Sequence, residues 1–310
     1  MAEMKKVATR DSYGNALKEL GAEFDNLVVL DADLAGATKT GVFQKAFPDR
    51  HFDCGIAEAS LICAAAGLST TGMVPFASTF AMFAAGRAFE QVRNSIGYPH
   101  LNVKIGATHG GISVGEDGAS HQCCEDFGLM RTIPGMVVMS PADDVEARAM
   151  VKAAYEYEGP VYIRFGRAAV PVFHEEGMKF EIGKGEVLRD GADVAIIANG
   201  LMVNEALIAA EELAAAGINA MVINMATIKP LDEELVLAVA EKCGKIITCE
   251  EHSVIGGLGE AVASFLAENH PTLVKRVGVN DEFGHSGPAG ALLKQFGLSS
   301  EKLVEVCKSF

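Results

Sequence analysis

The sequence has 310 residues, a length that gives each of two domains enough side chains to bury a core of its own. The formal net charge of −15 argues against a nucleic-acid-binding surface, which needs clustered lysines and arginines. No apolar run approaches the ~20 residues that span a bilayer, and the segment Met1–Lys6 lacks the apolar region of a signal peptide. The 7 cysteines form no Cys-x-x-Cys pair, so we expect reduced thiols and a cytoplasmic protein.

Short apolar runs alternate with helical segments along the chain. The runs predict nine buried strands: Leu27–Leu30, Met73–Phe76, Val103–Ala107, Met136–Met139, Val161–Arg164, Val194–Ala198, Ala220–Ile223, Lys245–Cys249 and Leu273–Val277. Helices are predicted between them at Asp11–Leu20, Glu58–Leu68, Val145–Tyr155, Asn204–Ala215 and Asp232–Lys242. This alternation predicts an α/β fold with two doubly wound domains and mainly parallel sheets.

The apolar pattern is interrupted over Val172–Glu186, where several charged residues occur together. Beyond this break, Gly191 precedes a second series of strands. We therefore divide the chain into a domain of residues 1–180 and a domain of residues 181–310.

Two local signals concern helices. Ser140-Pro141-Ala142-Asp143 has the composition of a helix start, with Ser140 as the expected N-cap. The predicted helix Glu58–Leu68 has few large side chains. Another backbone can therefore approach it closely, either in the core or at a subunit interface.

Glu58 stands among small and apolar neighbours at the start of that helix. The helix macrodipole favours an acid at this place, and no further role is required to explain it. The second interpretation is a partly desolvated carboxylate that shares a proton with a bound base.

A glycine-rich segment, residues 108–122, directly follows a predicted strand, where α/β proteins place their ligand crevice. It contains His109, Asp117 and His121. These residues are compatible with a binding site, with a solvated loop, or with a metal site that adds Cys123 and Cys124. The metal site is the least favoured, because the spacing matches no zinc pattern.

Other residues also have both a structural and a functional interpretation. Phe80 and Phe83 belong to an aromatic run that is more often core than a cofactor pocket. Arg164 and Arg167 end a predicted strand, where an arginine binds phosphate or carboxylate, or forms a buried ion pair. Gly256–Gly259 precedes a helix but lacks a phosphate-loop pattern, so a tight strand-to-helix turn suffices.

Taken in order, these segments resemble transketolase, specifically its pyrimidine-binding domain followed by its C-terminal domain. Gly55–Glu58 is similar to the family motif carrying the glutamate that activates the thiamine diphosphate cofactor. Three segments are similar to the family's substrate loop: Thr108–His109, Gly115–Gly118 and His121–Gln122. The aromatic pocket around the cofactor's aminopyrimidine is matched by Ser78–Phe80 with Phe83.

The resemblance implies a reaction and a role for each residue. A two-carbon ketol unit would pass from a ketose phosphate to an aldose phosphate. Glu58 would hydrogen-bond a ring nitrogen of the pyrimidine. The other implied contacts are Phe80, Phe83 and Asp33 to the cofactor, His109, Asp117 and His121 to the sugar, and Arg10 and Arg167 to its phosphate.

The sequence departs from the family pattern in three places. Gly86–Arg87 replaces an aromatic of the cofactor pocket, Gly110 replaces an acid after the loop's first histidine, and Ala37–Thr38 replaces a serine that would assist the phosphate. Gly110 and Glu250–Ser253 are closer to 1-deoxy-xylulose-5-phosphate synthase. Glu116, in contrast, completes a transketolase-like Gly-Glu-Asp-Gly.

The Gly-Asp-Gly segment that holds the metal in thiamine enzymes does not occur in this sequence. We therefore expect no metal ligands here. An N-terminal transketolase subunit with the diphosphate-binding domain would supply the Mg²⁺ or Ca²⁺ site. The resemblance implies two copies of each subunit, a contact between copies through the helix Glu58–Leu68, and a packing or interface role for the last domain.

Two alternatives remain. The chain could serve another thiamine enzyme, either like the synthase or like the β subunit of a 2-oxoacid dehydrogenase, although Gly115–Gly118 disfavours the dehydrogenase. It could also be a non-catalytic paralogue that binds a partner. The sequence leaves open whether the sugars belong to the pentose phosphate pathway or to a specialised catabolic set.

Overall fold

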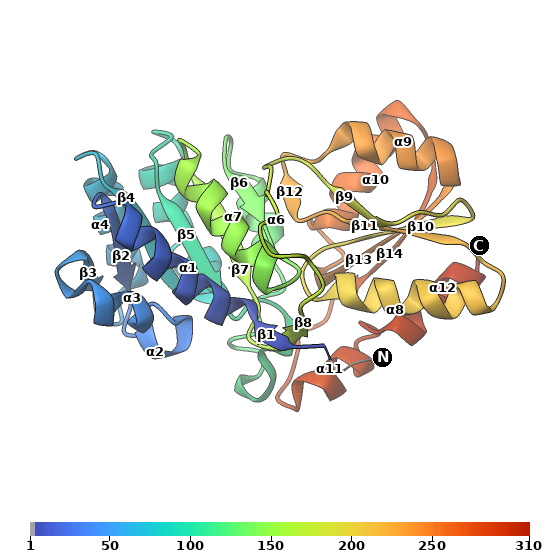
Figure 1. Ribbon diagram of the computed structural model, residues 1–310, viewed down its shortest axis with the longest axis horizontal. Helices are drawn as coiled ribbons and strands as arrows, with labels where there is room; N and C mark the ends of the chain where they lie inside the picture. Colours follow the sequence, from blue (N-terminus) through green and yellow to red (C-terminus); the bar gives the residue numbers. More distant parts are fainter. Residues whose placement is uncertain (1–3) are drawn as a thin grey trace.

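Two sheets, each covered by helices on both faces, lie side by side in the computed structural model (Figure 1). The structure describes residues 4–310, so residues 1–3, at the start of the segment searched for a signal peptide, lie outside the described part. The prediction of an α/β fold with two doubly wound, mainly parallel sheets is confirmed. Within residues 4–310, no helix has both the length and the apolar character needed to cross a membrane.

The first sheet has seven strands in the order β12-β6-β7-β5-β4-β2-β3. Neighbouring strands are parallel except for β12, which is antiparallel to β6. The chain reverses its winding direction between β2 and β4, the point at which doubly wound sheets form a ligand crevice. The strands are β2 (Leu27–Asp31), β3 (His51–Asp53), β4 (Val74–Phe80), β5 (Lys104–Thr108), β6 (Val137–Met139), β7 (Val161–Phe165) and β12 (Thr227–Lys229).

Helices cover this sheet on both faces because alternate strand residues point to opposite sides. One face packs on α1 (Thr9–Glu23), α3 (Gly41–Ala46) and α7 (Asp144–Glu156). The other packs on α4 (Glu58–Ser69), two π-helical segments, Met82–Arg87 and Val92–Gly97, and α6 (Asp126–Arg131). The remaining elements here are β1 (Lys6–Ala8), which pairs with β8 (Ala169–Pro171), α2 (Ala35–Thr38), α5 (Phe89–Gln91), and the 3-10 turns Pro48–Arg50 and Ile112–Asp117.

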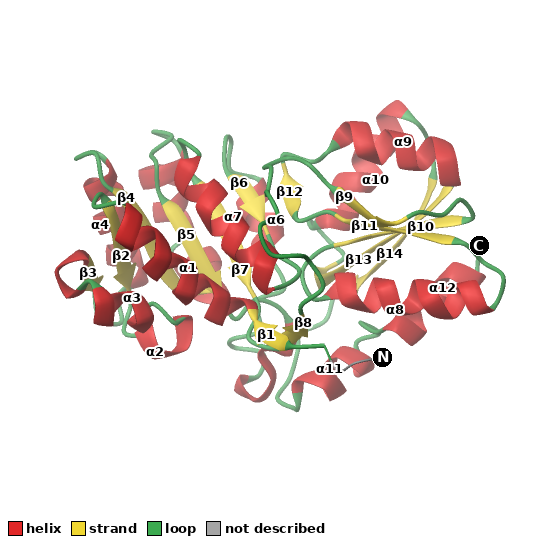
Figure 2. Cartoon of the chain, viewed as in Figure 1, coloured by secondary structure: helices red, strands yellow, loops and turns green. Residues whose placement is uncertain are grey.

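The second sheet has the order β14-β13-β10-β11-β9, with β9 as its antiparallel edge (Figure 2). Its strands are β9 (Glu186–Arg189), β10 (Val194–Ala198), β11 (Ala220–Asn224), β13 (Lys245–Ser253) and β14 (Leu273–Val279). One face carries α8 (Met202–Ala215), α11 (Ala289–Gln295) and α12 (Ser300–Lys308), and the other carries α9 (Glu233–Cys243) and α10 (Leu258–Asn269).

The nine predicted strands and five predicted helices are all present, with bounds that shift by a few residues. The prediction of Ser140 as a helix N-cap is wrong. The cap of α7 is Asp143, whose carboxylate accepts a hydrogen bond from the Glu146 amide, and the Ser140 hydroxyl instead donates to the Arg164 carbonyl. Both residues have good capping side chains, and the position of the preceding β6 decides between them.

The two halves share both a strand and a core. Thr227 of β12 pairs with Met139 of β6, although β12 follows β11 of the second sheet in the chain. One continuous cluster of buried apolar side chains extends from Ile105 in the first sheet through Ile228 to Ile246 in the second. The division at residue 180 stays a prediction, and the first sheet contains a strand from beyond it.

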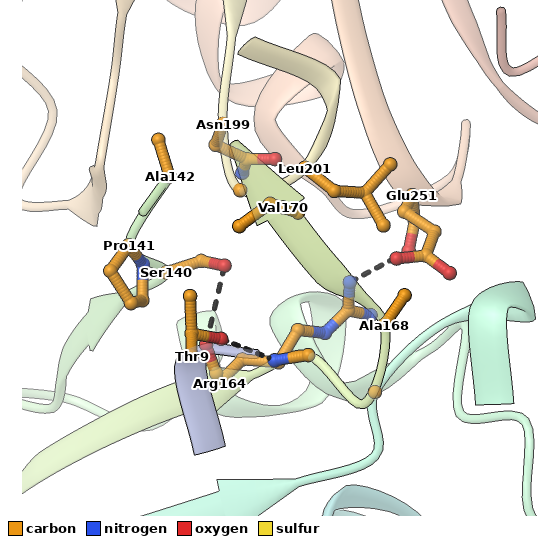
Figure 3. A pocket seen from close by; sticks show the side chains of 13 residues that line it. Thr9, Ser140, Pro141, Ala142, Arg164, Ala168, Val170, Asn199, Leu201 and Glu251 are labelled. Carbon is orange, nitrogen blue, oxygen red and sulfur yellow. Dashed lines mark hydrogen bonds between the residues drawn. The ribbon is translucent and has the colours of Figure 1, made fainter. Parts of the chain in front are cut away.

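A buried ion pair lies where the halves meet. The Arg164 guanidinium donates to both carboxylate oxygens of Asp126, at 2.6 and 2.9 Å, and the two side chains are 5% and 0% exposed. Arg164 also donates to the carbonyls of Glu251 and Cys123. A cavity of about 20 Å³, large enough for roughly one water, lies beside it and is lined in part by Asn199 (Figure 3).

Replacing Asp126 tests the ion pair. Asp126→Asn leaves the Arg164 charge buried without a counter-ion, so we expect a loss of about 3–5 kcal/mol in the free energy of unfolding, measured by urea denaturation. Glu305→Gln removes an exposed pair with Lys302 and is the control, with an expected change below about 0.5 kcal/mol. Equal effects of the two substitutions would contradict the structural role of the buried pair.

Candidate active site

Most of the predicted site residues follow the carboxyl ends of parallel strands in the first sheet. Asp33 comes after β2, Glu58 after β3, Phe80 ends β4, His109 follows β5 and Arg167 follows β7. The carboxyl ends of parallel strands share one sheet edge, which is where α/β proteins bind ligands. α1 begins at the same edge, because the Thr9 hydroxyl accepts a hydrogen bond from the Gly166 amide next to β7.

Glu58 is the first residue of α4 and is only 2% exposed. A carboxylate buried to this degree requires a counter-charge or several hydrogen bonds. Arg87, the last residue of a π-helical segment, supplies both: its Nη1 lies 2.9 Å from each oxygen of Glu58. The Arg87 side chain is itself 53% exposed.

Four rings form a cluster next to this carboxylate. The rings of Phe80 and Phe83 are stacked, with centroids 5.7 Å apart and planes inclined by 15°. His109 stacks on Phe80 at 3.9 Å, while His121 meets both phenylalanines edge-on. The Arg87 guanidinium lies 4.6 Å from the centre of the Phe83 ring. The structure therefore brings Glu58 and the four predicted ring residues into one place.

The hydrogen bonds of His109 define its tautomer. Arginine can only donate, so Nε2 of His109 accepts from Nη1 of Arg10 at 3.0 Å. Nδ1, 2.8 Å from the Thr108 hydroxyl, then carries the proton and donates. Burial, together with the positive charges of Arg10 and Arg167, lowers the pKa of His109 to about 3. His109 is therefore a neutral hydrogen-bonding group at neutral pH.

Arg10 and Arg167 lie close enough for their charges to interact, and burial and Arg167 both contribute to the lowered pKa of Arg10. Two neighbouring cations at a partly open edge favour an anion between them. Arg167 is held by the Val114 carbonyl and by Glu116, 3.0 Å from its Nη1. Because the Glu116 side chain is 65% exposed, this pair is weak, and Arg167 can exchange Glu116 for another anion.

Arg164 and Arg167, which the sequence treats alike, have different roles. Arg164 forms the buried ion pair with Asp126, whereas Arg167 stays partly exposed at the sheet edge. Asp33 and Asp117 are both exposed, and neither has a described contact to the ring cluster. Their expected contacts to cofactor and sugar stay predictions.

The two glycines after His109 are required by the side chains that pack against them. A Cβ on Gly110 would lie 2.3 Å from Nε of Arg164, and one on Gly111 would lie 2.3 Å from Cδ of Glu251. Gly111 also has φ +82°, which side-chain-bearing residues rarely adopt. The His109–Gly110–Gly111 turn is thus shaped by Arg164 and by a residue of the second sheet.

Residues of the second half of the chain bind the predicted substrate loop, residues 108–122, at two points. The Ser113 amide donates to the buried carboxyl group of Glu251 in β13. The Gln122 side chain donates to the His285 carbonyl, and to the carbonyls of Ile112 and Gly115 within the loop. The expected packing or interface role of the last domain stays a prediction, and these contacts show that the domain also holds the loop that carries Asp117.

Gly256–Gly259 forms a strand-to-helix turn. The Leu258 and Gly259 amides at the start of α10 donate to the carboxylate of Glu250, at 2.7 and 2.8 Å. An internal anion thus occupies the amides that a phosphate would bind. Across residues 4–310, no three His, Cys, Asp or Glu side chains gather in a group able to hold a metal ion.

Sequence reasoning did not assign roles to Arg87 and Glu251. Arg87 left one signal, since it belongs to the Gly86–Arg87 pair that replaces an aromatic of the family pattern. Glu251 belongs to the Glu250–Ser253 segment that is closer to the synthase, but nothing in the sequence indicates its bond to Ser113, 138 residues away, because only the docking of the two halves brings the two residues together.

Comparison with known proteins gives one family match for each half of the chain. The profile of the transketolase pyrimidine-binding domain matches residues 5–172, and that of the transketolase C-terminal domain matches residues 183–303. A putative transketolase C-terminal section from Methanocaldococcus jannaschii is 52% identical over 299 residues, covering 96% of this chain and 94% of the relative. A 6-deoxy-6-sulfo-D-fructose transketolase subunit, SqwH, from Clostridium sp. (strain MSTE9) is 45% identical, covering 95% of this chain and 92% of the relative. A solved structure described as a split gene transketolase, inactive beta4 tetramer, is 55% identical and has a TM-score of 0.92 over 98% of each chain.

The carboxyl group of Glu251 makes a pH-dependent contribution to stability. Burial, partly opposed by Arg164, raises its pKa to about 7. As the pH rises from about 4.5 towards 7, the unfolded chain ionises first, so the wild-type folded state loses stability over this window. Glu251→Gln keeps an acceptor for Ser113 but cannot ionise. We expect it to exceed wild type by less than about 1 kcal/mol at pH 5 and by up to about 3 kcal/mol at pH 8, measured by urea denaturation.

The exposed Glu268 provides a matched control. Glu268→Gln should change the free energy of unfolding by less than about 0.5 kcal/mol at either pH. A Glu251→Gln effect that is the same at pH 5 and pH 8 would show that the Glu251 carboxyl does not titrate in this window.

Proposed function

This chain belongs to the transketolase family, and we propose that it is the C-terminal subunit of a two-subunit transketolase. The proposed reaction transfers a two-carbon ketol unit from a ketose phosphate to an aldose phosphate with thiamine diphosphate. The single observation that carries the proposal is that one guanidinium, that of Arg87, contacts both the buried carboxylate of Glu58 and the Phe83 ring stacked on Phe80, at the carboxyl edge of a doubly wound sheet.

The residues present fit the aminopyrimidine part of the cofactor. Glu58 offers a buried carboxylate to a ring nitrogen, and Phe80 and Phe83 offer apolar faces to a flat ring. A planar nitrogen-rich group, the Arg87 guanidinium, already contacts both Glu58 and Phe83. When bound, thiamine diphosphate supplies the nucleophilic carbon with which the carbon–carbon bond is broken and formed. Glu58 would hold a proton at the ring nitrogen, in a setting that excludes most water.

The remaining site residues would bind the sugar phosphate. Neutral His109 would accept a hydrogen bond from a sugar hydroxyl at Nε2, in place of Arg10, without adding charge, and His121 lies beside it. Arg10 and Arg167 would hold the phosphate group, with Arg167 exchanging Glu116 for the substrate anion. Asp117, on the loop held by Glu251, would contact the donor hydroxyl groups, and Asp33 would line the cofactor cavity.

We propose that an N-terminal transketolase subunit supplies the diphosphate-binding domain and its Mg²⁺ or Ca²⁺ ion, in an assembly of two copies of each subunit. The description of the related solved structure as an inactive tetramer of β chains supports a need for the other subunit. The surface of α4 supports a contact at this place, since it exposes only small side chains at helical spacing, Ser60, Cys63, Ala64 and Gly67. The exposed side chains of Phe52 and Ile56 flank its start.

The alternative of a 1-deoxy-xylulose-5-phosphate synthase-like subunit loses part of its support. Gly110 is explained by the close approach of Arg164, Glu250 by its capping of α10, and Glu251 by its bond to Ser113. These packing roles make no demand on the substrate.

We also propose a cytoplasmic location, because the cysteines described are all free thiols.

The first test is ketol transfer from xylulose 5-phosphate to ribose 5-phosphate with thiamine diphosphate and Mg²⁺, by this chain alone and with the N-terminal subunit. We expect turnover only with both subunits. In the two-subunit enzyme, Glu58→Gln should lower kcat by about 100-fold or more, because proton sharing at the ring nitrogen is lost. Glu90→Gln is the control: it alters an exposed glutamate that has no role in the proposed site, and it should leave kcat unchanged. Unchanged turnover by Glu58→Gln would refute the catalytic assignment.

The phosphate-binding role of Arg167 predicts a selective loss of substrate affinity. Arg167→Ala should raise KM for xylulose 5-phosphate by about 10- to 100-fold, the value of a charge-assisted hydrogen bond, with a smaller effect on kcat. An unphosphorylated ketose such as erythrulose should show no such change. Arg93→Ala, at an exposed position, is the control. Equal losses with both donors would place Arg167 outside the phosphate site.

A further inference from the structure

We propose that the Arg87 guanidinium occupies the place of the cofactor's aminopyrimidine in the cofactor-free chain and leaves when the cofactor binds. This inference rests on the proposed function. It also assigns a role to Arg87 of the Gly86–Arg87 pair, which replaces an aromatic of the cofactor pocket in the family pattern.

The contacts of Arg87 are those expected of the pyrimidine ring. Its Nη1 lies 2.9 Å from both carboxylate oxygens of Glu58, and its guanidinium carbon lies 4.6 Å from the centre of the Phe83 ring. A guanidinium is planar and delocalised, donates hydrogen bonds to carboxylates and packs on aromatic faces. An aminopyrimidine bound to the same carboxylate and ring needs the same space, so the two groups compete.

The contact balances the buried charge of Glu58. Glu58 is 2% exposed, and a buried carboxylate without a cation is strongly destabilising. Arg87 compensates this charge until a ligand does so. It also keeps the Glu58 and Phe83 side chains in the arrangement that the ring would meet.

Arg87 is placed so that it can leave. Its side chain is 53% exposed, whereas the buried Arg164 of the junction is 5% exposed. It ends the π-helical segment Met82–Arg87, a helix form often found at functional sites. Gly86 before it contributes no side chain, and a Cβ there would meet only the flexible end of the Met82 side chain. Of the Gly86–Arg87 pair, only Arg87 has a side chain, and this side chain contacts Glu58 and Phe83.

Displacement of Arg87 would reduce the apparent affinity for the cofactor, since only the fraction of molecules with Arg87 displaced can bind. If this fraction is about one in ten, removing the guanidinium tightens binding by about tenfold. Removing the guanidinium should also lower the stability of the cofactor-free chain, because Glu58 is then buried without a cation.

Two measurements on Arg87→Met test the inference. The dissociation constant of thiamine diphosphate for the two-subunit enzyme with Mg²⁺, measured by isothermal titration calorimetry, should fall about tenfold. The Tm of this chain alone without cofactor should fall by several degrees. The double variant Glu58→Gln with Arg87→Met should recover that Tm, because a neutral amide needs no cation. Arg93→Met is the matched control and should alter neither quantity.

Other outcomes overturn the inference in distinct ways. Weaker cofactor binding by Arg87→Met would mean that Arg87 contacts the bound cofactor directly. Unchanged affinity and Tm would make the pair an incidental surface contact. If the chain with Arg87→Met does not fold, Arg87→Lys keeps the charge without the planar group and should still tighten binding by about threefold. No binding of thiamine diphosphate by the wild-type two-subunit enzyme would refute the proposed function as well, whereas binding that both variants leave unchanged refutes only the role of Arg87.

Discussion

The buried ion pair between Arg164 and Asp126 joins the parts of the molecule that meet at the candidate site. Arg164 ends a central strand of the first sheet, Asp126 begins α6, and the same guanidinium donates to the Glu251 carbonyl in the second sheet. Its position also requires Gly110 to lack a side chain. The geometry of the loop after His109 therefore depends on an ion pair that is itself buried.

A second buried charge, Glu58, is handled differently. Both partners of the Arg164–Asp126 pair are inaccessible, so neither can change partner without unfolding the junction. In the Glu58–Arg87 pair the acid is buried but the arginine is half exposed. The first arrangement is suited to holding structure, and the second to exchanging one cation-like partner for another. Two ion pairs of the same chemistry thus differ in solvent access: one is closed on both sides, and the other leaves its cation half exposed.

The sequence predicted the fold class and the position of every long strand, because buried parallel strands are short, continuous apolar runs such as Val194–Ala198. It also selected Glu58, Phe80, Phe83, His109 and His121, which the structure brings together. It failed at Ser140, because Ser140 and Asp143 are both good caps and only the end of β6 distinguishes them. It also could not anticipate β12, three residues of the later half that complete the first sheet.

What the sequence determined by itself are properties that depend on near neighbours: the alternation of strands and helices, the glycines of the loop, and the order of motifs that marks the family. What only the tertiary structure decided are the partners of the charged groups. Arg164 and Arg167 are three residues apart, yet one is buried against Asp126 and the other faces solvent with Glu116. Glu251 meets Ser113 across 138 residues, and Arg87 meets Glu58 across 29. A charge can be read from the sequence, but its burial and its partner are set by how distant elements pack, and these decide what it does.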